Sequence, residues 1–261
     1  MNEPQFFEID GSYGEGGGQI LRTSITLSLI LNKPIKVKNI RAKRNIPGLK
    51  PQHITAVKLL ADMCGAEVQN LQLGASWVTF NPGEKPQPSL KFDVGTAGSI
   101  SLILIAAVPA ASLNGVGCEL ELKGGTDVKW SPTIDYFRYV VLPAFKLLGI
   151  NCTIDVIKRG YFPRGGGIVK AYIKPLKKLK PQQIVSRSTS PISGISICSN
   201  LPKGVAERQM RTALDRLYSQ NVRWSNITID VTDAISPGSS ITLYSVSKGS
   251  FLGADNVGEQ G

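Results

Sequence analysis

The stretch that decides the fold of this chain is IDGSYGEGGGQILR, residues 9–22. An apolar strand runs directly into a glycine-rich turn, and a helix-like run follows. The turn holds Gly14, Gly16, Gly17 and Gly18. Glycines let backbone N–H groups approach an anion closely, and the start of a helix adds a partial positive charge. A glycine-rich turn alone is more often only a tight turn, so its neighbours decide whether it binds phosphate.

Two charged side chains, Glu15 and Arg22, flank this turn. Arg22 lies in the first turn of the predicted helix and can point towards the glycines. Glu15 could hold a divalent cation or pair with Arg22, and the string alone slightly favours the ion pair. No G-K-[S/T] follows, so this is not a Walker A loop, and there is no G-x-G-x-x-G fingerprint in a clear Rossmann context.

Cations gather in a second motif, RAKRNIPGLKPQH, residues 41–53. They are Arg41, Lys43, Arg44 and Lys50. Arginine presents a planar fork that matches phosphate oxygens, and the motif ends where Gln52 and His53 open a predicted helix. A run of cations by itself favours a solvated loop, but the glycine turn in the same unit favours a phosphate pocket. For His53 alone, a hydrogen-bonded histidine at a helix start is favoured over a nucleophile.

The order of predicted elements repeats along the chain, and Gly11 and Gly95 mark a period of 84 residues. Each unit is predicted to be strand, helix, strand, helix, strand, strand. We therefore expect an α+β fold of repeated βαβαββ units, residues 1–84 and 85–178, followed by a smaller α/β domain at 179–261. Two helices on one face of a four-stranded sheet leave apolar surface uncovered, so such units must pack against each other.

The individual elements follow from apolar periodicity. Helices are predicted at 19–31, 53–63, 100–113, 134–148 and 204–218, and strands at 6–9, 35–40, 67–73, 76–81, 92–94, 118–123, 152–157, 168–173, 192–199, 227–231 and 241–246.

The balance of charged residues indicates which chemical class of partner the protein binds. Lysine and arginine total 30 against 19 acidic residues, and the net charge of +11 favours a polyanion such as nucleic acid, a nucleotide or an anionic membrane surface. No apolar stretch reaches the roughly 18 residues of a membrane span, and no secretory signal is seen, so we expect a soluble cytoplasmic protein that does not use a membrane. A lone histidine excludes a multi-histidine metal site within this chain, and four scattered cysteines are expected to be buried apolar residues.

Two loops of the second unit carry lesser candidates. In GGTDVKWSP, residues 124–132, Trp130 or Pro132 could pack against a base, although a loop tryptophan is as often a structural plug. RGYFPRGGG, residues 159–167, is a second glycine-rich basic turn, for which a hairpin turn is the favoured interpretation.

Five motifs, IDGSYGEGGGQILR, RAKRNIPGLKPQH, VGTAGS, GGTD and YFPRGGG, occur in an order that closely resembles the RNA 3′-terminal phosphate cyclase family. The match runs from about Phe6 to Pro175. The resemblance implies a trefoil-like arrangement of three repeats, each like the C-terminal domain of translation initiation factor 3. It also implies a smaller domain inserted before the third repeat, which is not in this chain.

The resemblance also implies a chemistry. ATP and a divalent cation, Mg or Mn, adenylylate a histidine, AMP passes to an RNA 3′-phosphate, and the neighbouring 2′-OH displaces AMP to give a 2′,3′-cyclic phosphate. The expected partners are therefore ATP and RNA 3′-phosphate ends. The motifs carry over Glu15, Gly16, Gly17, Gly18 and Pro132 to the nucleotide, Glu15 to the metal, and Arg22, Arg41, Arg44, Gln52 and His53 to the phosphates or RNA.

The chain departs from the family pattern in two respects. The nucleophilic histidine and an adenine-stacking tyrosine belong to the third repeat, so the nucleophile is expected C-terminal to Gly261 and no catalytic residue is predicted here. Residues 253–261 stand about where that repeat should begin. Ile105 occupies a position where relatives often carry glutamine.

We therefore expect the chain to be part of a longer cyclase, an expectation that a native mass of 28 kDa would refute. Apolar faces left exposed by a missing unit would then predict a sticky or homodimeric fragment. Two alternatives compete with the cyclase: a non-catalytic, cyclase-like factor for RNA binding or ribosome assembly, and an enolpyruvyl-transferase-like enzyme.

Overall fold

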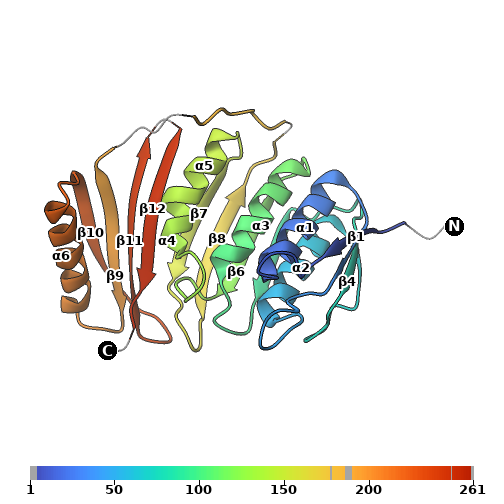
Figure 1. The fold of residues 1–261 in the computed structure, drawn as a ribbon, viewed down its shortest axis with the longest axis horizontal. Helices are drawn as coiled ribbons and strands as arrows, with labels where there is room; N and C mark the ends of the chain where they lie inside the picture. Colours follow the sequence, from blue (N-terminus) through green and yellow to red (C-terminus); the bar gives the residue numbers. More distant parts are fainter. Residues whose placement is uncertain (1–4, 177, 186–189, 248, 260–261) are drawn as a thin grey trace.

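A computed structural model describes residues 5–176, 178–185, 190–247 and 249–259. Within these residues the strands form three four-stranded sheets. Figure 1 shows the sheets following one another across the molecule in chain order, with helices packed between them. No helix of the described part has the length and apolar character to cross a membrane.

The first sheet and its helices come from residues 7–81. The elements are β1 (Phe7–Asp10), α1 (Gly18–Leu31), β2 (Ile35–Lys38), α2 (Pro51–Cys64), β3 (Glu67–Gln69) and β4 (Val78–Asn81). Strands β1 and β2 are parallel, β4 pairs antiparallel with β2 and β3, and the sheet order is β1-β2-β4-β3. Helix α2 ends where Gly65 adopts a left-handed conformation, as glycine commonly does after a helix.

The second sheet repeats this arrangement. Its elements are β5 (Ser89–Asp93), α3 (Ile100–Leu113), β6 (Cys118–Gly124), α4 (Ile134–Tyr136), η1 (Phe137–Val141), α5 (Leu142–Leu147), β7 (Cys152–Lys158) and β8 (Gly167–Ile173). The sheet order β5-β6-β8-β7 matches that of the first sheet position by position. The predicted α+β class and the repeated βαβαββ order are therefore confirmed.

The predicted helix at 134–148 is not continuous. Its middle, η1, widens into a π-helical turn between α4 and α5. Pro143 stands in the first turn of α5 and has no N–H to donate to the preceding turn. Such a local widening accommodates a missing donor, which apolar periodicity does not reveal.

The third sheet belongs to the smaller C-terminal part. It comprises β9 (Ile192–Ser199), α6 (Gly204–Ser219), β10 (Trp224–Thr232), β11 (Gly238–Ser247) and β12 (Ser250–Val257), in the order β10-β9-β11-β12. The sequence pattern does not predict β12. The expectation that residues 253–261 begin a further unit is wrong for residues 253–257, which pair antiparallel with β11. The strand lacks clear alternation because Gly253 stands where a side chain would collide with Tyr136 and Val140.

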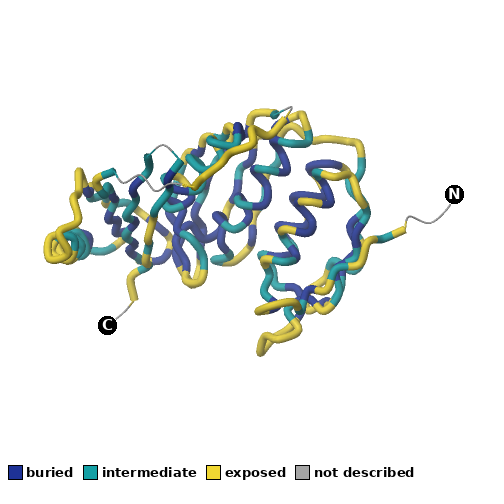
Figure 2. Tube along the Cα trace, turned by 45° about the horizontal axis from the view of Figure 1, so that its top comes forward, coloured by how far each residue is buried: buried dark blue, intermediate teal, exposed yellow. Residues whose placement is uncertain are grey.

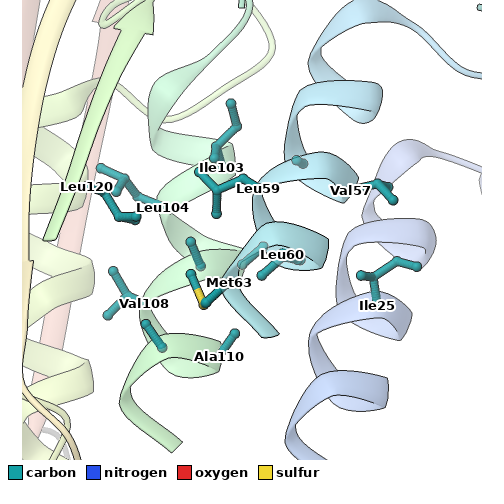
Figure 3. Packing of buried hydrophobic residues seen from close by; sticks show 14 of the residues in the cluster. Ile25, Val57, Leu59, Leu60, Met63, Ile103, Leu104, Val108, Ala110 and Leu120 are labelled. Atoms are coloured by element: carbon teal, nitrogen blue, oxygen red, sulfur yellow. The ribbon is translucent and has the colours of Figure 1, made fainter. Parts of the chain in front are cut away.

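The apolar core is shared by the first two units. Side chains from α1, α2 and α3 interlock, as Figure 3 shows for Ile25, Leu60, Met63 and Leu104, and all four are almost fully buried. The cluster continues to Ile173 in β8, and no described residue of β9–β12 belongs to it. Figure 2 shows buried positions running along these helices. The domain boundaries 1–84, 85–178 and 179–261 stay a prediction.

Candidate functional site

The turn between β1 and α1 is rich in glycine and leads into a helix start without a side-chain cap. Gly14 and Gly16 both have φ near +59°, a conformation that glycine adopts without strain. Gly17 is the N-cap of α1, and no side chain caps the first turn of this helix. Since the first N–H groups of a helix have no partner inside the helix, they are available to an anion.

Gly18 brings the start of α1 against the start of α2. A Cβ added at Gly18 would collide with Nε2 of His53, so only glycine lets the two helices approach this closely. The backbone N–H of Lys50 donates to Nδ1 of His53 over 3.1 Å. Nδ1 is therefore an acceptor, and Nε2 carries the proton of the neutral imidazole and faces the glycine turn.

His53 is held uncharged by its surroundings. It is only 2% exposed, and burial is the main cause that lowers its pKa to about 3. The positive charges of Arg22, Arg41 and Lys50 lower it further. A neutral imidazole at this place can donate a hydrogen bond at physiological pH, but it does not act as a cation.

The three predicted arginines differ in what they contact. Arg22 is half-buried, burial lowers its pKa, and it has no hydrogen-bond or ion-pair partner among the described residues. Arg41 instead closes its own loop, donating from Nη1 to the carbonyl oxygens of Ile46 at 2.7 Å and Gly48 at 3.0 Å. Arg22 is therefore the guanidinium that is free to meet a phosphate.

The expected Glu15–Arg22 ion pair is wrong. The Oε2 atom of Glu15 lies 3.2 Å from Nη2 of Arg44, and both side chains are largely exposed. The first turn of α1 directs Arg22 inward towards His53, whereas the loop after β2 carries Arg44 across the glycine turn. Separation in the sequence concealed this pairing, because the two residues belong to different motifs.

Gln52 connects this cluster to the second unit. Its Oε1 accepts a hydrogen bond from the backbone N–H of Ser99, the N-cap of α3, over 3.4 Å. Next to Ser99, the hydroxyl of Ser101 donates to the carbonyl oxygen of Pro132 over 2.5 Å, which sets Pro132 beside the start of α3. The starts of α1, α2 and α3 therefore meet, and each contributes about half a positive charge.

Two cavities adjoin these helix starts. A pocket of about 450 Å³ is lined by Glu15, Gly16 and Gly17 together with the first turns of α1. A larger cavity of about 930 Å³ begins at Gln52 and Ser99 and extends between the second unit and the third sheet. The predicted site residues thus gather at the helix starts, with Gln52 at the edge of the larger cavity.

A buried ionic network that the sequence does not predict lies between the second unit and the third sheet. Nη1 of Arg159 lies 2.6 Å from Oδ2 of Asp135 and 3.4 Å from Oδ2 of Asp127, and all three side chains are buried. The hydroxyl of Ser240 in β11 donates to Asp127 over 3.1 Å. The network joins the second unit to the third sheet beneath the larger cavity, and GGTD and RGYFP were its only sequence signals.

In the described part of the chain, the site offers one carboxylate, and not a full set of protein ligands, to a metal ion. No group of three or more histidine, cysteine or acidic side chains in the described residues could hold a metal ion. Glu15 offers a single carboxylate beside the open helix start. Magnesium is commonly held by one or two carboxylates together with substrate phosphates, and the residues fit a cation of that kind.

Comparison with known proteins identifies the family. The family model described as RNA 3′-terminal phosphate cyclase matches residues 13–248. The RNA 3′-terminal phosphate cyclase of Methanococcoides burtonii is 46% identical over 245 residues, which cover 94% of this chain and 73% of that protein. Those of Ignicoccus hospitalis and Pyrococcus furiosus are each 43% identical, over 97% of this chain and 74% of their own length. With the repeated βαβαββ units and the open helix starts, these matches show that the chain belongs to the RNA 3′-terminal phosphate cyclase family.

Proposed function

We propose that this chain binds the 3′-phosphate end of RNA together with ATP and acts in the conversion of that end to a 2′,3′-cyclic phosphate. The identity to proteins named RNA 3′-terminal phosphate cyclase supports this activity. So does the net charge of +11, which suits a polyanionic substrate.

One observation carries the proposal. Arg22 is a half-buried guanidinium without a partner among the described residues, and it stands beside the neutral donor His53 where helix starts meet. A cation without a counter-ion in a partly buried place is unfavourable unless a ligand supplies the negative charge. A phosphate, which accepts several charge-assisted hydrogen bonds, satisfies the arginine, the histidine and the free helix N–H groups together.

The chemistry requires this concentration of positive charge. A terminal phosphate becomes cyclic only if it carries a better leaving group than hydroxide. A histidine nitrogen first bonds to the α-phosphorus of ATP and displaces pyrophosphate, and an oxygen of the 3′-phosphate then displaces that histidine to take the AMP. The 2′-oxygen then bonds to the 3′-phosphorus, AMP departs with the electrons of the broken P–O bond, and the 2′-OH loses its proton. Donors fixed around the phosphate stabilise the charge that develops.

The AMP is transferred through a histidine, and we do not assign that role to His53. Its Nδ1 accepts the N–H of Lys50, and its Nε2 is packed against Gly18. Nδ1 is therefore occupied by the protein and Nε2 carries the proton, so the ring can donate a hydrogen bond to a phosphate but has no free lone pair with which to attack one. We keep the expectation that the nucleophile lies C-terminal to Gly261.

A divalent cation, Mg or Mn, belongs to the same proposal. Glu15 would hold it together with the phosphates of ATP, and the cation would neutralise those phosphates. Gly16, Gly17 and Gly18 would face the nucleotide with their backbone, and Pro132 would lie against the adenine. We also propose a cytoplasmic location, which suits the four free cysteines because thiols persist in a reducing compartment.

The test uses the full-length protein with α-labelled ATP and an RNA oligonucleotide whose 3′-phosphate is labelled. We expect label from ATP on the denatured protein and conversion of the RNA end to a phosphatase-resistant cyclic phosphate. RNA binding with neither result would favour the non-catalytic factor. Binding of phosphoenolpyruvate in place of ATP would favour the transferase.

A further inference from the structure

Trp130 occupies a conformation that stability does not explain. It stands in the loop between β6 and α4 with φ +66°, where a bulky side chain is strained. Its side chain is 97% exposed, so burial does not compensate for the strain. Strain of this kind persists where the surrounding structure imposes it, and it clusters at functional sites.

The surrounding structure does impose it, because the loop is anchored on both sides of the tryptophan. Before Trp130, the buried Asp127 accepts a hydrogen bond from Ser240 of the third sheet. After it, the carbonyl oxygen of Pro132 accepts a hydrogen bond from the hydroxyl of Ser101 in α3 over 2.5 Å. The indole is therefore presented to solvent by a loop that is itself fixed.

A second exposed aromatic ring shares the same cavity. Phe162, in the loop between β7 and β8, is 78% exposed and lines the cavity of about 930 Å³ together with Trp130. Arg164 lines it as well, and so does Lys129, whose Nζ lies 2.8 Å from Oε1 of Glu259. Arg164 donates from Nη2 to the carbonyl oxygen of Ile235 over 2.9 Å, which fixes the guanidinium at the cavity wall. Exposed aromatic rings between cations are typical of proteins that bind single-stranded nucleic acid.

We propose that Trp130 and Phe162 form a stacking site for the bases that precede the 3′-phosphate of single-stranded RNA, with Arg164 facing a backbone phosphate. The inference rests on the proposed function, because a terminal phosphate held at the helix starts determines which end of the RNA enters. Continuity supports it: Gln52 contacts the start of α3 and also lines this cavity. Arg164, which has no carboxylate partner among the described residues, favours a polyanion over an apolar peptide as the occupant.

The test measures equilibrium binding of two 3′-phosphorylated octaribonucleotides. One carries all its bases, and the other has the same backbone but lacks the bases before the last nucleotide. We expect Trp130→Gly to weaken binding of the first roughly tenfold and to leave the second nearly unchanged, since stacking acts through the bases. Trp130→Phe should keep most of the affinity, and Phe162→Ala should act like Trp130→Gly.

Two controls keep the result interpretable. Glycine tolerates the left-handed conformation, so Trp130→Gly should unfold at the same temperature as the unchanged protein or slightly higher. Tyr218→Ala removes a ring that is 75% exposed on α6, away from the cavity, and should not alter RNA binding.

Equal loss of both oligonucleotides on Trp130→Gly, or no loss of either, would overturn the stacking site. So would a loss confined to ATP, which would make the ring part of the nucleotide site. The proposed function fails separately, if the unchanged protein does not prefer 3′-phosphate over 3′-hydroxyl ends.

Discussion

The first two units share one topology but treat their helix starts differently. In the first unit, α1 begins at Gly17 with no side-chain cap. In the second unit, the hydroxyl of Ser99 accepts the N–H of Leu102 at the start of α3, and the hydroxyl of Thr133 caps α4. Corresponding helix starts in the two units therefore differ in whether their first N–H groups are satisfied by a side chain of the protein.

The second helix of each unit shows the same contrast. At α4, the carboxylate of Asp255 in β12 also accepts the N–H of Thr133 over 2.5 Å, so the third sheet completes the cap. At α2, the neutral ring of His53 accepts the N–H of the N-cap residue Lys50, no side chain of the N-cap accepts a first-turn N–H, and the Nε2 proton points at the glycine turn. The two units share one sheet order but differ in the residues that cap their helices.

The largest effect should come from Gly18→Ala. The added methyl group collides with His53, and overpacking of this kind costs about 1–3 kcal/mol of unfolding free energy. Denaturant unfolding measures it, and phosphate binding should fall with it because the helix starts are forced apart. Gly98→Ala, at the residue before the N-cap of α3, places its methyl 2.7 Å from Cγ1 of Val94, a side-chain end that can shift, so equal losses in both variants would break the comparison.

Arg22→Ala should weaken binding of 3′-phosphorylated RNA by roughly 10- to 100-fold, because a charge-assisted hydrogen bond to phosphate is lost. The melting temperature should stay the same or rise, since the arginine has no partner among the described residues to lose. Arg41→Ala should do the reverse and lower stability more than affinity, because its guanidinium closes its own loop. Titration and thermal melting of both variants decide between these outcomes.

Gly17→Asp would give α1 the kind of cap that α3 and α4 already have. The carboxylate should accept the free N–H groups and repel phosphate, lowering affinity for 3′-phosphorylated RNA about tenfold while stability changes by a few tenths of a kcal/mol. Thr133→Ala is the matched change in the second unit, with an expected cost of about 1–2 kcal/mol and no change in phosphate affinity. Unchanged affinity in Gly17→Asp would show that the open start of α1 does not bind the ligand.

The smallest effect concerns pH. The pKa of His53 is about 3 in the folded protein, below its ordinary value near 6.5. Between these values the unfolded chain binds a proton that the folded protein does not, so stability should fall as pH falls through this window. His53→Gln should make the slope of unfolding free energy against pH shallower by up to about one proton. Parallel slopes would mean that the ring is charged in the folded protein.

Much of the fold could be predicted because apolar periodicity and glycine stops repeat in both units. The helix at 100–113 and the strand at 192–199 were predicted to the residue. Strand β12 could not be predicted because its sequence does not alternate between apolar and polar residues. Its pairing with β11 is seen only in the three-dimensional structure. The homodimer stays a prediction, to be checked by gel filtration.

The candidate site was predictable in its residue types but not in its pairings. Motifs placed the glycines and arginines near one another, yet the sequence could not show that Arg44, not Arg22, meets Glu15. It also could not show that Arg159 reaches Asp127 and Asp135, because these partners lie 32 and 24 residues away along the chain. A contact between two side chains that are far apart in the sequence produces no periodic pattern from which it could be predicted.

In the proposed complex, the substrate phosphate would supply the cap that the first turn of α1 lacks. Without phosphate, the leading amides of this helix should exchange their hydrogens with solvent rapidly, and occupancy should slow that exchange and raise the melting point. The rise in melting temperature could therefore be used to screen ligands, because a ligand that caps the first turn of α1 stabilises the folded protein.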